Sequence, residues 1–260
     1  MKKFIFILVA LSFVHAPAFA KVVSEPVDYT ENGQALQGFL FYDDADNGKR
    51  PGVIVVHEWM GLGSYAKKRA EMLVDLGYVA FAADMYGKGV LAKTHDEAAA
   101  LSGVLFKDRK RMRARAQAAL DAFLKTGKVN EDKVAAIGYC FGGTSVLEMA
   151  RSGMPVKGVA SFHGVLSTSA IAHPGDVKAK VLVFTGAEDR MVLPGDVLSF
   201  EDEMRAAHVD WELVRFGGAK HSFTVWDANL PDQGIQYNKA ADKRSWAMLQ
   251  DFLKEIFDVK

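Results

Sequence analysis

Cysteine is almost absent from this sequence, because Cys140 is the only one among 260 residues. An internal disulfide is therefore excluded, although the chain begins with a segment typical of export into an oxidising compartment. A lone thiol in such a compartment is either a buried, inert side chain or one retained for its reactivity. The residues around Cys140 must decide between these two interpretations.

A net charge is also lacking, since 32 Lys and Arg residues balance 32 Asp and Glu residues. The balance excludes the bulk positive field that draws proteins to DNA or anionic lipid, so nucleic acid is not expected as a partner. The basic run Lys107–Arg115 is expected to form a solvated helix face. The histidines and carboxylates lack metal-ligand spacing, and neither a metal nor an organic cofactor is expected.

A long apolar segment occurs only near the start, at Phe4–Val14, after the positive pair Lys2-Lys3. Ala18-Phe19-Ala20 then has small residues at its first and third positions, the pattern that signal peptidase cuts. The pattern predicts a signal peptide at residues 1–20 and an exported protein, periplasmic or secreted, whose mature part is a single domain at residues 21–260. A membrane anchor needs about 20 apolar residues, so stable insertion into a membrane is not expected.

Short apolar segments alternate with segments of helical periodicity along the mature chain. Strands are expected at 25–30, 36–42, 52–56, 78–83, 134–137, 156–162, 181–185 and 211–216, and helices at 65–76, 96–125, 141–150, 197–207 and 237–257. Asn32-Gly33 between the first two strands is a hairpin signal. The alternation predicts an α/β fold with a mostly parallel central sheet of about eight strands and helices on both faces.

The segment Gly138–Gly143, with the sequence Gly-Tyr-Cys-Phe-Gly-Gly, lies between a predicted buried strand and a predicted helix. It is typical of a nucleophile elbow, where Gly138 and Gly142 allow strand and helix to approach closely. The helix dipole favours the thiolate of Cys140, and the N–H group of Phe141 is placed to stabilise an oxyanion. The alternative is a buried cysteine among glycines that only serve packing.

A nucleophile of this kind needs a base and an acid that orients the base, and in this topology the chain order is nucleophile, acid, histidine. Asp189 and its neighbour Glu188 follow the strand at 181–185, and His221 follows the last strand. Asp189 is favoured as the acid, although adjacent residues point in different directions and the sequence leaves Glu188 open. His221 is favoured over the other histidines because of its place in the order.

These segments together resemble the dienelactone hydrolase family of the α/β-hydrolase fold; they are Gly138–Gly143, His57–Trp59, Gly186–Asp189 and His221–Phe223. The resemblance implies that Glu58 holds the thiol proton in the resting enzyme. Such proton sharing is physically reasonable, because burial and a neighbouring thiolate would raise the pKa of the Glu58 carboxyl. It also implies that the N–H of Trp59 joins that of Phe141 in the oxyanion hole. His163 belongs to another segment that borders the site in the family.

The family's prototypes hold a substrate carboxylate with two arginines, and the matching positions here are Lys88 and Val225. A lysine lacks the bidentate fork of arginine, so dienelactone itself is not expected as the substrate. Lys88, Tyr86 and His163 are candidate substrate-binding residues. The expected function is hydrolysis of a small-molecule ester, lactone or thioester by a Cys-His-Asp triad. A binding protein on the same fold and a redox-sensing thiol are the alternatives, and the oligomeric state is left open.

Overall fold

The computed structural model describes residues 22–45 and 48–258, so the predicted signal peptide lies outside the described residues. Its main strands are β1 Val22–Glu31, β2 Gln34–Asp43, β3 Arg50–Val56, β4 Val79–Ala83, β5 Val129–Tyr139, β6 Gly158–Phe162, β7 Lys180–Gly186 and β8 Trp211–Phe216. They form one eight-stranded sheet in the order β1-β2-β4-β3-β5-β6-β7-β8. β2 pairs antiparallel with β1 and β4, and the other pairs are parallel. The predicted mostly parallel sheet is confirmed.

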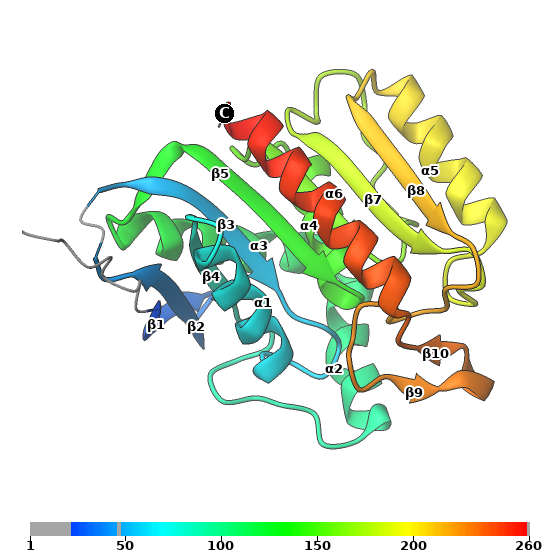
Figure 1. Cartoon of the computed structure of the whole chain (residues 1–260), viewed down its shortest axis with the longest axis horizontal. Coiled ribbons are helices and arrows are strands. Elements are labelled where there is room, and N and C mark those ends of the chain that lie inside the picture. Colours follow the sequence, from blue (N-terminus) through cyan, green and yellow to red (C-terminus); the bar gives the residue numbers. More distant parts are fainter. Residues whose placement is uncertain (1–21, 46–47, 259–260) are drawn as a thin grey trace, which may run out of the picture.

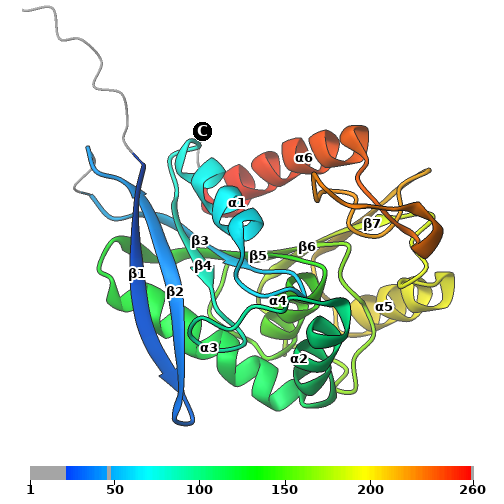
Figure 2. The same ribbon diagram turned by 90° about the horizontal axis from the view of Figure 1, so that it is seen from below.

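Helices cover both faces of this sheet (Figures 1 and 2). They are α1 Ser64–Val74, α2 His95–Lys107, α3 Arg109–Lys125, α4 Phe141–Arg151, α5 Pro194–Ala206 and α6 Lys239–Phe257. Figure 2 shows α1 and α6 on one side of the sheet and the remaining helices on the other. The strands supply the two halves of the core by alternation: Val53 and Val55 pack with the α1 and α6 side, whereas Ile54 and Val56 pack with the other.

The helix predicted over residues 96–125 is in fact two helices, α2 and α3, which break at Asp108. Asp108 has φ −118° and ψ 80°, outside the helical region, and its carboxylate accepts a hydrogen bond from the N–H of Arg111. That bond caps α3. A sequence rich in alanine, lysine and arginine hides this break, because no glycine or proline marks it.

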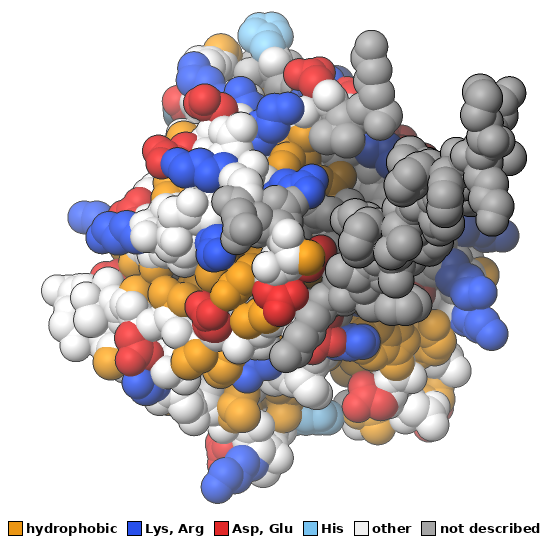
Figure 3. Space-filling model, turned by 60° about the vertical axis from the view of Figure 1, so that its left-hand side comes forward, with side chains coloured by type: hydrophobic (Ala, Val, Ile, Leu, Met, Phe, Trp, Pro, Cys, Tyr) orange, Lys and Arg blue, Asp and Glu red, His pale blue; other side chains and the backbone are white. Residues whose placement is uncertain are grey.

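The basic run Lys107–Arg115 is only partly the solvated face that was predicted. Arg115 is 3% exposed and donates hydrogen bonds to the main-chain oxygen of Met85, and Arg113 pairs with Glu148, which is fully buried. The prediction is wrong for these two arginines, because α3 packs against the β1 hairpin and α4 on its inner side. On the face seen in Figure 3, basic and acidic side chains are interspersed.

A small hairpin after β8 was not predicted. It consists of β9 Asn229–Leu230, a 3-10 turn at Pro231–Gln233 and β10 Ile235–Gln236, drawn in orange in Figure 1. Two-residue strands are too short for hydrophobic alternation to reveal. The hairpin meets the chain at His221, whose N–H donates to the oxygen of Gly234 and whose oxygen accepts from the N–H of Gln236. Between residues 22 and 258, apart from 46 and 47, no helix is long and apolar enough to cross a bilayer.

Candidate active site

Cys140 lies at a sharp turn between β5 and α4, as the sequence predicts. Its φ of 54° is in the left-handed region that few residues other than glycine adopt. A Cβ atom on Gly138 would lie 2.1 Å from the oxygen of Gly142, and one on Gly142 would lie 2.2 Å from the oxygen of Val56. Both positions therefore require glycine, because strand and helix pass each other at backbone contact distance.

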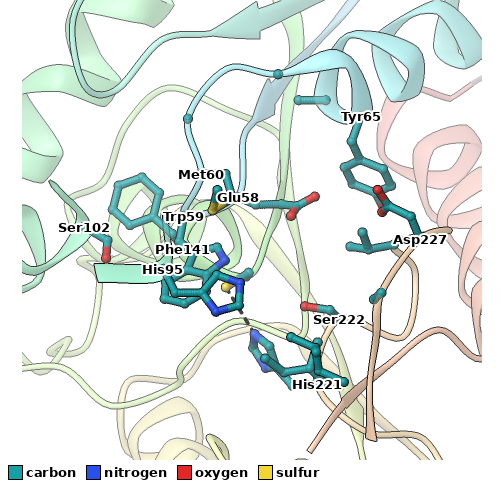
Figure 4. A pocket seen from close by; sticks show the side chains of 18 of the residues that line it. Glu58, Trp59, Met60, Tyr65, His95, Ser102, Phe141, His221, Ser222 and Asp227 are labelled. Atoms are coloured by element: carbon teal, nitrogen blue, oxygen red, sulfur yellow. Dashed lines mark hydrogen bonds between the residues drawn. The ribbon is translucent and has the colours of Figure 1, made fainter. Parts of the chain in front are cut away.

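The structure brings Cys140, His221 and Asp189 into contact. His221 Nε2 lies 3.1 Å from Cys140 Sγ, the interaction drawn as a dashed line at His221 in Figure 4, and His221 Nδ1 lies 2.9 Å from Asp189 Oδ2. The other carboxylate oxygen of Asp189 accepts a hydrogen bond from the N–H of Met191 at 2.8 Å. Glu188, the alternative acid, is exposed. This arrangement of thiol, imidazole and carboxylate is able to carry nucleophilic acyl transfer.

The charges of these groups favour a protonated His221. Burial of the imidazole opposes protonation, but a negative charge on Cys140 and the hydrogen bond that His221 donates to Asp189 outweigh it and raise the pKa of His221 to about 10. An imidazolium 3.1 Å from Sγ stabilises negative charge on the sulfur. The geometry therefore allows a proton to pass between Sγ and the imidazole.

A cavity of about 550 Å³ opens above the sulfur at the carboxyl ends of the parallel strands. Its walls are mostly apolar and aromatic, and include Trp59, Met60, Tyr65, Phe106, Phe141, Val165, Met191, Val225, Leu230 and Ile235. Its titratable side chains are Glu58, His95, Cys140, His221 and Asp227. Among the described residues, no lysine or arginine lines this cavity, and no group of three or more His, Cys, Asp or Glu side chains is arranged to hold a metal ion.

Glu58 lies in the cavity wall, with its carboxylate on the side of Tyr65 and Asp227 in Figure 4. Burial, and then the charge of Asp227, raise the pKa of Glu58 to about 7, although the charges of His221 and Arg69 partly offset them. Within the described residues no hydrogen bond joins Glu58 to Cys140. The structure thus places Glu58 in the same cavity as the thiol, without a direct hydrogen bond to it among the described residues.

The two N–H groups expected to form an oxyanion hole both belong to residues that line the cavity. Phe141 begins α4, and Trp59 follows β3 by three positions. Neither main-chain N–H has an acceptor within the described part of the chain. Free main-chain donors in the same cavity as a thiol are groups that an oxyanion would require.

The three candidate substrate-binding residues do not line the cavity, so direct substrate contact by them lacks geometric support. Lys88 is exposed and pairs with Asp28 of the β1 hairpin at 2.7 Å. Tyr86 is buried, and its hydroxyl donates to the oxygen of Trp59 at 2.9 Å. His163 is fully buried and binds the main chain of the nucleophile instead.

The sequence prediction missed Tyr65 and Asp227 on one wall and Arg69 behind it. Arg69 is 2% exposed and pairs with Asp242 of α6. A signal for Arg69 existed, because it lies three residues after Ala66 on the buried face of the predicted helix. Nothing comparable marks Asp227, which reaches the cavity because the loop after His221 turns back over it.

Comparison with known proteins decides the family. The model of the dienelactone hydrolase family matches residues 36–257, nearly all of the described chain. The chain belongs to the dienelactone hydrolase family. As a member of this family with the α/β-hydrolase fold, the protein is a hydrolase.

Several relatives of this dienelactone hydrolase family member match most of its length. The solved structure of P91, a dienelactone hydrolase-like promiscuous phosphotriesterase from metagenomic libraries, is 38% identical, with a TM-score of 0.85 over 91% of this chain and 99% of its own. The protein usf of Aquifex pyrophilus is 25% identical over 90% of this chain and 99% of its own. A protein of Aquifex aeolicus, provisionally named a carboxymethylenebutenolidase, is 27% identical over 77% of this chain and 87% of its own.

Proposed function

We propose that this protein hydrolyses uncharged esters, lactones or thioesters of carboxylic acids with Cys140 as the nucleophile, His221 as the base and Asp189 as the residue that orients it. One observation carries the proposal. Sγ, the imidazole and a buried carboxylate form a continuous chain of contacts of 3.1 and 2.9 Å at the floor of an apolar cavity.

In the proposed reaction the Cys140 thiolate attacks the carbonyl carbon, and the carbonyl oxygen becomes an oxyanion near the N–H groups of Phe141 and Trp59. The tetrahedral intermediate collapses to a thioester as His221 gives its proton to the leaving alcohol. His221 then takes a proton from water, which attacks the thioester. The second intermediate releases the carboxylic acid and returns the thiolate and imidazolium. No metal or organic cofactor takes part in these steps.

Glu58 is proposed to control charge in this cavity. With a pKa of about 7 it is largely neutral below that pH, and a neutral carboxyl does not oppose negative charge on Sγ or on the oxyanion. Its position in the cavity also allows it to receive the thiol proton through a water molecule. Both effects fit the role that the family resemblance implies for Glu58.

The charges of the cavity wall support an uncharged substrate. Glu58 and Asp227 contribute carboxylates, whereas the candidate cation, Lys88, is engaged with Asp28 outside the cavity. A substrate carboxylate would therefore meet like charge and find no lysine or arginine of the cavity wall to pair with. Dienelactone, which carries a carboxylate, remains a poor expected substrate.

The nucleophile is tested with p-nitrophenyl butyrate and with thioester and lactone counterparts. Cys140→Ala should lower turnover at least about a thousandfold, and rapid quenching of the parent enzyme should give a mass increase of one butyryl group on Cys140. Lys88→Ala is the matched control and should leave turnover within about twofold. Equal turnover by the parent and Cys140→Ala would reject the proposal, and an unreactive Cys140 would favour a binding protein instead.

The charge of the substrate is tested with two esters of one length, mono-p-nitrophenyl glutarate and its methyl ester. The neutral methyl ester should have a kcat/KM at least about tenfold higher, which corresponds to about 1.4 kcal/mol. Val225→Arg places a cation in the cavity wall and should reduce this preference. A parent enzyme that prefers the glutarate monoanion would contradict the assignment.

A neutral phosphotriester is a second candidate substrate. The 38% identical P91 is described as a promiscuous phosphotriesterase, and a cavity wall without lysine or arginine suits an uncharged triester. Cys140 would displace the aryloxide from phosphorus and form a phosphorylated thiol that water must cleave. Paraoxon hydrolysis by the parent that is lost in Cys140→Ala would support this activity. Phosphorylation of Cys140 without turnover would show that paraoxon is an inhibitor and not a substrate.

We also propose that the chain is exported and cleaved near Ala20, on the evidence of the sequence pattern alone. Expression of the full chain in a Gram-negative host should give a protein in the periplasm or medium whose first residue is Lys21 or a close neighbour. A cytosolic product that keeps Met1 would contradict export.

A further inference from the structure

His163 is a buried histidine that the proposed chemistry does not use. It follows β6 directly, is fully buried and has a φ of 43°, in the left-handed region. A residue other than glycine keeps this conformation only where its surroundings fix it, and such positions cluster at functional sites. The contacts of its ring indicate what the position does.

Both ring nitrogens of His163 have partners, and the partners come from two different catalytic segments. The N–H of Cys140 points at His163 Nδ1 at 3.1 Å and is shared with the oxygen of Phe162 at 2.9 Å. His163 Nε2 lies 2.8 Å from Oγ1 of Thr224. Because Nδ1 accepts, a neutral ring carries its proton on Nε2 and donates it to Thr224.

The ring is held neutral by its environment. Burial, followed by the positive charges of His221 and Arg69, lowers the pKa of His163 well below its usual value. A neutral ring is needed here, since an imidazolium would have no free Nδ1 lone pair for the N–H of Cys140.

Thr224 lies three residues after His221, on the same loop, and is itself firmly held. Its main-chain oxygen accepts from Arg69 at 3.0 Å, and its hydroxyl contacts the hydroxyl of Tyr65 at 2.7 Å. Arg69 is anchored in turn by Asp242 of α6. The loop of His221 is thus tied to α1, α6 and, through His163, to the nucleophile elbow.

We propose that His163 is a positioning residue, whose neutral imidazole sets the separation between Cys140 Sγ and His221 Nε2 by bridging the main chain of one to the loop of the other. The inference rests on the proposed function, because it concerns how the reacting pair is aligned. The rings of His163 and His221 also lie in edge contact, with centroids 5.2 Å apart. Misplacement of reacting groups by about 1 Å can cost about a hundredfold in rate.

The test is a double-mutant cycle on two conservative variants. His163→Phe keeps a ring but loses both hydrogen bonds, and Thr224→Val keeps the shape but loses the hydroxyl. Each should lower kcat for p-nitrophenyl butyrate, by about a hundredfold and about tenfold respectively, with KM within about threefold. The double variant should be no slower than His163→Phe within about twofold, because both changes break one bridge. Thr224→Ser, which keeps the hydroxyl, should restore most of the rate.

A second readout separates positioning from simple stabilisation. The rate at which iodoacetamide alkylates Cys140 at pH 7 reports the contact of Sγ with the imidazolium, and it should fall with kcat in both variants. Thr126→Ala removes a partly buried hydroxyl at the end of α3, which donates to the main-chain oxygen of Phe123, and is the control. It should lower the melting temperature without changing kcat or alkylation.

Three results would overturn the inference. The first is a double variant in which the losses of kcat of the two single variants multiply. The second is a pair of single variants that lose thermal stability but keep their kcat. The third is a variant in which kcat falls while the rate of Cys140 alkylation is unchanged. Should His163→Phe fail to fold, Thr224→Val and Thr224→Ser decide alone. A parent enzyme without ester turnover, whose Cys140 resists iodoacetamide, would reject the proposed function; an active parent with an unaffected Thr224→Val would reject only the role of His163.

Discussion

Replacement of Glu58 by glutamine should stabilise the protein, and the gain should grow with pH. Burial raises the pKa of this carboxyl from its ordinary value of 4.5 to about 7, and the charge of Asp227 adds to the effect. The folded chain therefore binds the Glu58 proton more tightly than the unfolded chain does. Stability is lost as the pH rises from about 4.5 to about 7, because folding then requires a charged carboxylate in an unfavourable place.

The size of the stability change follows from the rise in the pKa of Glu58. At 1.36 kcal/mol per pKa unit, the rise from 4.5 to about 7 corresponds to about 3 kcal/mol. Water reaches part of the Glu58 side chain, which reduces the expected loss to about 2 kcal/mol. Glutamine has nearly the same shape and no charge, so Glu58→Gln should match the parent near pH 4.5 and exceed its unfolding free energy by about 2 kcal/mol at pH 8.

The measurement is urea denaturation of both proteins at pH 4.5, 6 and 8. Glu188→Gln, at an exposed neighbour of Asp189, is the control and should differ from the parent by a constant amount. Asp227→Asn removes the second cause of the raised pKa and should shrink the pH dependence of the parent. A gain for Glu58→Gln that is equal at pH 4.5 and 8, or larger at pH 4.5, would refute the reasoning about burial.

Three further outcomes are expected. Asp189→Asn should lower kcat by about 10²-fold to 10⁴-fold at neutral pH, because an amide cannot hold His221 in the tautomer that acts as a base. Burst kinetics would measure this loss, and an equal loss in a variant of an exposed carboxylate would contradict the role of Asp189. Glu148→Gln removes a fully buried carboxylate that pairs with Arg113 of α3 and Arg151 of α4, and it should lower the unfolding free energy by about 3 to 5 kcal/mol in urea; a change smaller than about 1 kcal/mol would count against this reasoning. Gly142→Ala forces a Cβ against a main-chain oxygen and should abolish Cys140 alkylation together with stability; a folded, fully active variant would show that the elbow can widen.

Much of the fold could be predicted because its strands are buried on both faces. Segments such as Val53–Val56 and Val79–Ala83 are continuous apolar runs, and a parallel sheet covered by helices is the structure that buries them. The break at Asp108 and the hairpin at 229–236 could not be predicted. No glycine or proline marks the break, which a local side-chain cap stabilises, and the strands of the hairpin are too short for hydrophobic alternation to reveal.

The residues of the candidate site also fall into those that could be predicted from the sequence and those that could not. The order of nucleophile, acid and histidine is a property of the topology, so the sequence placed Cys140, Asp189 and His221 at one end of the sheet, where the structure brings them together. The direction of a side chain on a loop is not such a property. Lys88 follows a strand as a site residue should, yet it turns to Asp28 because the β1 hairpin supplies the nearest carboxylate.

The charges around the sulfur explain why a cysteine suits this elbow. His221, with a pKa of about 10, keeps its proton at neutral pH, which favours a partner that is already negative. A thiolate meets that condition and a serine hydroxyl does not, because an alcohol holds its proton far above neutral pH. Without the sulfur charge, which is the largest of the causes that raise it, the pKa of His221 would fall, so a serine at position 140 would face a more nearly neutral imidazole. The alcohol would still hold its proton until His221 removes it during the attack, so Cys140→Ser should be slower than the parent, although serine serves in the same elbow in many related folds.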